Sequence, residues 1–85
     1  MGKYSVEIIS KAEKEFLKLP ELVRIKLRKQ IILLENNPRP FSSKKLRETE
    51  YYRLRSGDYR VVYSINDNDK IIKVLSIAHR KDVYK

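Results

Sequence analysis

The first residues of the chain alternate between polar and apolar side chains. In KYSVEII, at positions 3–9, every second residue is apolar, which predicts a β-strand with one buried face. Apolar residues then recur at helical spacing from Ser10 to Leu19, which predicts a short helix. This helix ends before Pro20, because proline cannot continue the backbone hydrogen-bond ladder.

A second helix is predicted directly after Pro20, a residue well suited to the first turn of a helix. In ELVRIKLRKQIILLENN, apolar side chains recur on one side and basic side chains lie largely on the other. The candidates for burial are Val23, Leu27, Ile31 and Leu34. The Asn-Asn-Pro sequence at 36–38 ends this helix, so the two helices form a hairpin joined at the proline.

From Tyr51 onward the apolar period is two again, which predicts three more strands. They span 51–55, 59–66 and 70–78. Turn residues separate them, first Ser56-Gly57 and then the Asn-Asp-Asn-Asp sequence. The last strand is apolar on both faces, which indicates a central position in the sheet. Before the first of these strands, PRPFSSKKLRETE has no clear period and is predicted to be a basic loop.

These elements give the order β-α-α-β-β-β in a chain of 85 residues, which is the length of one domain, 1–85. We therefore predict an α+β fold. In it, the helical hairpin packs on one face of a mainly antiparallel sheet.

The first turn sets which residues face each other across the hairpin. A two-residue turn at 56–57 pairs Arg55 with Asp58 and Arg53 with Arg60. In this register the apolar residues of the two strands meet one another, whereas a slip by one residue would mix the faces. Arg53 and Arg60 are then direct neighbours on the face away from the helices.

Two interpretations of this arginine pair remain open. Like charges directly opposite each other are destabilising, but on a solvated surface the long side chains can splay apart with little effect. Alternatively, the two guanidinium groups form a preorganised phosphate clamp, because their planar forks match phosphate oxygens.

The charge balance favours an anionic partner. The formal net charge is +9 and the pI is near 9.9, which suits nucleic acid, an acidic protein or a membrane surface. There is no apolar run long enough to span a membrane. With no cysteine and a single histidine, a zinc site is not expected, and the chain fits the reducing cytoplasm. No phosphate-binding loop, dinucleotide fingerprint or Ser-His-Asp pattern occurs, so we expect no cofactor.

Two residues near the end of the chain have a structural and a functional interpretation. His79 is either a surface residue near a strand end or a proton carrier near neutral pH. Tyr84 either packs against the domain or stacks on a base of single-stranded nucleic acid.

The segment YYRLRSGDYRVVYSI, followed by a polar turn, an apolar strand and HRKDVY, resembles the RelE/ParE superfamily of toxins from toxin–antitoxin pairs. LPELVRIKLRKQI and KKLR are also similar to that superfamily, so the resemblance covers nearly the whole chain. It implies the same β-α-α-β-β-β fold and a cognate antitoxin protein as partner. RelE-type members cleave mRNA in the ribosomal A site, by attack of a ribose 2′-hydroxyl on the adjacent phosphate to leave a 2′,3′-cyclic phosphate.

The resemblance also implies a set of site residues. Arg60 matches the strand arginine that stabilises the reacting phosphate, and Arg80 matches a second phosphate contact or acid partner. Tyr84 matches the tyrosine that stacks on or orients the nucleotide, while Arg53 matches the second of two lysines. The expected catalytic residues are Arg60, Arg80, Tyr84, Arg53 and His79. The expected substrate-binding residues are Tyr51, Arg55, Lys45, Arg47 and Lys81.

The chain departs from the RelE pattern at the lysine pair, where it has Tyr51 and Arg53. Arginine is effectively never deprotonated, so Arg53 cannot be a conventional general base. It can still stabilise charge in the transition state, while proton transfer falls to His79, Tyr51, Tyr84 or a ribosomal group. Two alternatives to cleavage stay open, namely a ParE-like toxin that binds DNA gyrase and a basic RNA- or ribosome-binding module with weakened catalysis.

Overall fold

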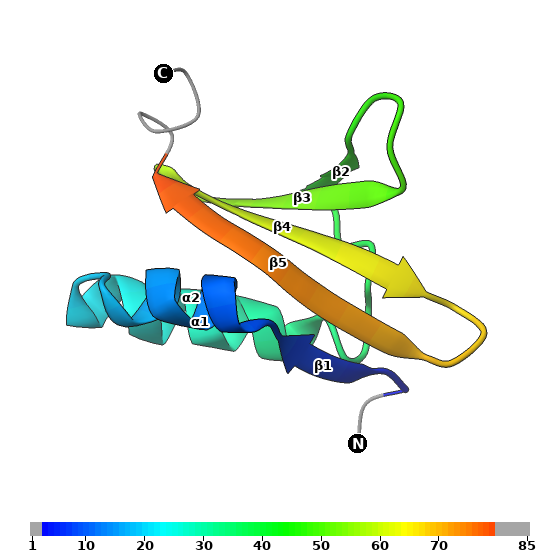
Figure 1. The fold of residues 1–85 in the computed structure, drawn as a ribbon, viewed down its shortest axis with the longest axis horizontal. Helices are drawn as coiled ribbons and strands as arrows, with labels where there is room; N and C mark the ends of the chain where they lie inside the picture. Colours follow the sequence, from blue (N-terminus) through cyan, green and yellow to red (C-terminus); the bar gives the residue numbers. More distant parts are fainter. Residues whose placement is uncertain (1–2, 80–85) are drawn as a thin grey trace.

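The computed structural model describes residues 3–79, which form two helices and one five-stranded sheet. The elements are β1 (Ser5–Ile8), α1 (Ser10–Leu17), α2 (Glu21–Leu33), β2 (Ser43–Lys45), β3 (Tyr51–Ser56), β4 (Tyr59–Asn66) and β5 (Ile71–His79). Both helices lie on the same side of the sheet (Figure 1). The strand order is β1-β5-β4-β3-β2, with β1 parallel to β5 and every other pair antiparallel.

The predicted fold class is confirmed, with one additional strand. The N-terminal strand, the helical hairpin and the three later strands are all present, and β5 is central, between β1 and β4. The segment predicted to be an aperiodic loop contains β2, which pairs with β3 at the edge of the sheet. Three residues are too few to show a period in the sequence, so β2 is defined only by its partner strand.

Burial of apolar side chains between the helices and the sheet holds these elements together. The predicted helical spacing of Leu27, Ile31 and Leu34 is confirmed, because all three are buried, whereas Val23 packs at the margin. The remaining buried apolar residues are Ala12, Phe16, Leu54, Val61, Tyr63, Ile72, Val74 and Ile77. Fully burying one such side chain is worth about 1.5–3 kcal/mol, so this cluster fixes which face of each strand points inward.

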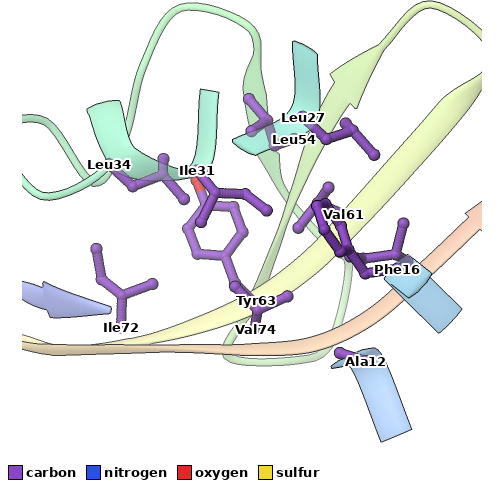
Figure 2. Packing of buried hydrophobic residues seen from close by; sticks show 11 residues of the cluster. Ala12, Phe16, Leu27, Ile31, Leu34, Leu54, Val61, Tyr63, Ile72 and Val74 are labelled. Atoms are coloured by element: carbon purple, nitrogen blue, oxygen red, sulfur yellow. The ribbon is translucent and has the colours of Figure 1, made fainter. Parts of the chain in front are cut away.

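Tyr63 joins the core to the loop that follows α2. Its ring reaches from β4 toward α2 and lies next to Ile31 (Figure 2). The residue is fully buried, its hydroxyl donates a 2.8 Å hydrogen bond to the carbonyl oxygen of Pro38, and burial raises the pKa of the phenol. The ring stacks on Tyr52 with a centroid separation of 5.9 Å, so the loop, β3 and β4 meet at one tyrosine pair.

A polar network on the surface connects segments that lie far apart in the sequence. Arg39 donates two hydrogen bonds to the Asp67 carboxylate, at 3.3 and 2.9 Å, and a third of 3.1 Å to the Tyr52 hydroxyl. The hydroxyl of Tyr4 donates to the same carboxylate at 2.6 Å. The hydrogen bond from Arg39 is the main reason that the pKa of Asp67 is lowered to about 2, and the same contact raises the pKa of Arg39.

We expect Asp67→Asn to lower the free energy of unfolding near neutral pH. An aspartate with a lowered folded-state pKa stabilises the fold above its ordinary pKa of 3.8 and loses this contribution as the pH falls toward about 2. The variant should therefore show a smaller loss of stability between these pH values. Urea unfolding at a series of pH values measures this, with Asp69→Asn in the same turn as the control. If the stability of Asp67→Asn varied with pH as the wild type does, the lowered pKa of Asp67 would not be the source of that pH dependence.

We expect Tyr63→Phe to lower the free energy of unfolding by about 1–3 kcal/mol, because the change keeps the ring but removes a hydrogen bond to a partly buried carbonyl. Denaturant titration followed by circular dichroism measures this difference. Tyr51→Phe is the matched control, since that side chain is 45% exposed. Equal stabilities of the two variants would show that the bond to Pro38 contributes nothing.

Candidate functional site

The face of the sheet turned away from α1 and α2 carries a group of basic side chains. Leu54 and Val61 are buried in the core that the helices cover. Because strand residues alternate between the two faces, Arg53, Arg55 and Arg60 project from the opposite one. We call this surface the open face and define it by Lys44, Arg53, Arg55 and Arg60.

The cross-strand partners on the open face differ from those predicted. In the structure Arg60 lies opposite Arg55, and Arg53 lies opposite Val62. The predicted Arg53–Arg60 pair is therefore wrong. The predicted Arg55–Asp58 pair is wrong as well, because Asp58 is a turn residue with no partner in the hairpin register.

Turn geometry explains this correction. The two central turn residues are Gly57 and Asp58 rather than Ser56 and Gly57, and Gly57 has a φ of 58°. A hairpin turn with glycine in its first central position favours this left-handed conformation. Moving the turn by one residue changes every partner by two positions, so each side chain keeps its predicted face. The arginines still share the open face, in a different pairing.

Strand β2 adds a fourth cation that the sequence did not indicate. Lys44 lies directly opposite Arg53, whereas Lys45 lies opposite Tyr52. The register therefore places Lys45 on the same face as Tyr52 and brings Lys44, not Lys45, next to the arginines. Arg47, another expected binding residue, is exposed in the loop that follows β2. Only the pairing of β2 with β3 distinguishes the two lysines, because they are adjacent in the sequence.

The open face combines positive charge with a buried hydrogen-bond donor. Within residues 3–79, Lys44, Arg53 and Arg55 form no ion pair with a carboxylate. The Nε atom of Arg53 is buried and has no hydrogen-bond acceptor within the described part of the chain. Like charges directly opposite each other and a buried donor without an acceptor both cost free energy. An anion with several oxygens, such as a phosphate, would offset the cost of the like charges.

Small side chains of β5 lie beside the basic residues of the open face. Ala78 lies opposite Arg60, and Ser76 lies opposite Val62. Tyr51 also projects from this face, opposite Ser64, and is 45% exposed. An exposed aromatic ring beside guanidinium groups can stack on a base while the cations bind phosphates.

The structure separates His79 from the arginines. His79 pairs with Tyr59, and the two rings meet edge to face with centroids 5.0 Å apart. Together with Glu15 of α1 and Lys18, the residue that follows this helix, they line a pocket of about 470 Å³ on the helix side of the sheet. The His79 side chain therefore lies on the helix side of the sheet, and this geometry gives no support to its expected role as a proton carrier.

A β-bulge determines the face of His79. The register shifts between Val62, which pairs with Ser76, and Tyr63, which pairs with Val74. Leu75 is the extra residue, so strict alternation fails in the middle of β5. No simple sequence pattern marks a bulge in a strand that is apolar on both faces.

The remaining site predictions lie outside the described residues, namely Arg80, Lys81 and Tyr84. Among residues 3–79, no group of three or more His, Cys, Asp or Glu side chains is placed to hold a metal ion. In the same part of the chain, no helix is both long and apolar enough to cross a membrane.

Comparison with known proteins relates this arrangement to one family. The family model of the ParE toxin of the type II toxin–antitoxin system parDE matches residues 6–84. The mRNA interferase toxin RelE of Escherichia coli K12 is 31% identical over 80 residues, which are 92% of this chain and 84% of that protein.

Solved structures agree with this relationship. A chain of the archaeal RelE–RelB complex from Pyrococcus horikoshii superimposes with a TM-score of 0.83 at 37% identity, covering 92% of this chain and 96% of that one. The isolated E. coli RelE toxin gives a TM-score of 0.79 at 30% identity, covering 95% and 90%. The sequence, the fold and the matched length agree, and the chain belongs to the RelE/ParE superfamily of toxins from type II toxin–antitoxin systems.

Proposed function

We propose that this protein is the toxin of a type II toxin–antitoxin pair and an endoribonuclease that cuts mRNA on the ribosome, which inhibits translation in the cytoplasm. The observation that carries the proposal is the open face, where four cations lie together and Lys44, Arg53 and Arg55 have no carboxylate partner among the described residues. The E. coli relative that is 31% identical is named an mRNA interferase toxin, which supports the same activity here.

The proposed reaction is an internal transfer of the phosphate. The ribose 2′-oxygen forms a bond to the adjacent phosphorus while the bond to the 5′-oxygen of the next nucleotide breaks. The products are a 2′,3′-cyclic phosphate and a free 5′-hydroxyl. The proton leaves the 2′-hydroxyl for a base, and the departing 5′-oxygen takes up a proton from an acid. Negative charge increases on the phosphate oxygens between these events, and fixed guanidinium groups can stabilise it there.

The chemistry of each side chain decides whether it stabilises the phosphate, binds the nucleotide or transfers a proton. Arg60 stabilises the reacting phosphate, Arg53 binds the RNA backbone beside it, and Arg80 adds a further contact or protonates the leaving oxygen. Tyr84 and Tyr51 bind the nucleotide through their rings. Arg53 cannot accept the proton, because a guanidinium stays charged. Since His79 lies on the helix side, we assign proton transfer to Tyr51, Tyr84 or a group of the ribosome.

We expect the double change Arg60→Ala and Arg80→Ala to remove cleavage, with a loss of about 100-fold or more in rate, because charge-stabilising groups of this kind contribute about 10²–10³. Primer extension on a translated message after induction measures cuts within codons. The control is Lys26→Ala with Lys29→Ala, which removes the same charge from exposed positions on α2. Circular dichroism checks that each variant is folded.

The outcome of this experiment also separates cleavage from its alternatives. Growth arrest without cuts in the wild type would reject the nuclease.

The matching family model is that of the ParE toxin, and that observation favours DNA gyrase as the second candidate target. A supercoiling assay with purified protein tests it, and inhibition that survives Arg60→Ala would support gyrase binding. Ribosome binding with neither cuts nor gyrase inhibition would indicate a module with weakened catalysis.

We further propose a cognate antitoxin as the protein partner, since a solved relative is a RelE–RelB complex. Exposed apolar side chains of α2 support a protein partner, among them Leu22, at 80% exposure, and Leu33, at 62%. We expect the antitoxin to raise the melting temperature of the toxin, because a ligand that binds only the folded state stabilises it by about 2.7 kcal/mol at 100 times its Kd. Differential scanning calorimetry measures this shift.

An acidic peptide of the same net charge as the antitoxin serves as the control, because it separates specific binding from charge neutralisation. Equal melting temperatures with and without the antitoxin would count against the partnership.

A further inference from the structure

The cations of the open face form two rows across neighbouring strands. In one row Arg55 of β3 lies opposite Arg60 of β4, and in the other Lys44 of β2 lies opposite Arg53 of β3. Since Arg53 and Arg55 are two residues apart, the rows are separated by about 7 Å along the strand. Each row therefore presents two positive charges to one region of space.

We propose that the open face binds two successive phosphates of one RNA strand, and that Lys44 and Arg53 hold the second. This inference rests on the proposed function, because the Arg55–Arg60 row then takes the reacting phosphate. An RNA strand carries one negative charge per nucleotide, so neighbouring phosphates can occupy neighbouring rows. Lys44 thereby becomes a substrate-binding residue, whereas Lys45 was the lysine expected in this role from the sequence.

Phosphate binding explains the position of Lys44 on the edge strand better than a purely solubilising role does. Lysines on edge strands often serve only to keep the edge in water. Lys45 fits that description, since it lies opposite Tyr52 and meets no cation across the strand. Lys44 instead lies opposite Arg53, and this pairing costs free energy because neither charge has a carboxylate partner among residues 3–79.

The unsatisfied donor of Arg53 gives the second, independent observation. Its Nε atom is buried and has no hydrogen-bond acceptor among residues 3–79, so the structure around Arg53 leaves part of its guanidinium unsatisfied. A phosphate between Lys44 and Arg53 would provide oxygens to the guanidinium and to the ammonium group together. The two cations are suited to different tasks, because arginine binds two oxygens in a fixed fork and lysine acts as a point charge.

The test measures binding of a short RNA whose 2′-hydroxyls are methylated, so that it cannot be cut while its phosphates stay intact. For single strands, the logarithm of the binding constant falls with the logarithm of salt concentration by about 0.7 per phosphate contact. We expect Lys44→Ala to reduce this slope by about 0.7 and Lys44→Arg to restore it. Lys29→Ala, on exposed α2, should leave the slope unchanged.

A second probe locates the contact. One phosphate at a time is replaced by a neutral methylphosphonate, and each probe is measured with wild type and with Lys44→Ala. At the phosphate that Lys44 holds, the losses of binding free energy caused by the methylphosphonate and by Lys44→Ala should not be additive. At every other phosphate, the two losses should be additive. A methylphosphonate at this same phosphate should also be non-additive with Arg53→Ala. A methylphosphonate at the adjacent phosphate should be non-additive with Arg55→Ala.

Three results would overturn the proposal. They are an unchanged slope in Lys44→Ala, additivity at every phosphate, or a reduced slope in Lys45→Ala with none in Lys44→Ala. The last result would return the role to Lys45. Cleavage of a translated message is recorded separately on the wild type, so loss of the nuclease and loss of the Lys44 contact are distinguishable.

Discussion

The arrangement of this protein depends on one constraint, namely that helices cover only one face of the sheet. Leu54 and Val61 must point toward α1 and α2, and alternation then sends Arg53, Arg55 and Arg60 to the other side. Burying each large apolar side chain is worth about 1.5–3 kcal/mol, whereas a like-charge pair across two strands costs at most about 1 kcal/mol. Burial therefore determines the faces, and the charge repulsion remains on the face where we propose that RNA binds.

The same energies explain how much of the site the sequence could predict. Alternation identified which arginines share a face, because a shift by one residue would expose Leu54 and bury a charge. It could not distinguish registers that differ by two residues, since these bury the same side chains. Gly57 decides whether Arg53 or Arg55 lies opposite Arg60. Its left-handed conformation places it at the first central position of the turn, and this register pairs Arg55 with Arg60.

Features that depend on long-range pairing were not visible in the sequence. Strand β2 has three residues, and the position of Lys44 opposite Arg53 follows only from its pairing with β3. The side of the sheet that His79 occupies follows from the extra residue Leu75 in β5. By contrast, the helical hairpin and the element order were predictable, because they rest on spacing within single segments.

The network around Arg39 has a consequence for binding at the opposite side of the sheet. Tyr52 lies between Tyr51 and Arg53 on β3, and its own side chain is held by Arg39 and stacked on Tyr63. The proposed RNA strand would meet a β3 backbone that is already paired on both sides, so the entropy cost of association would fall mainly on the ends of long side chains. The contacts of Tyr52 with Arg39 and Tyr63 thus help to hold β3 from the face that the RNA would not touch.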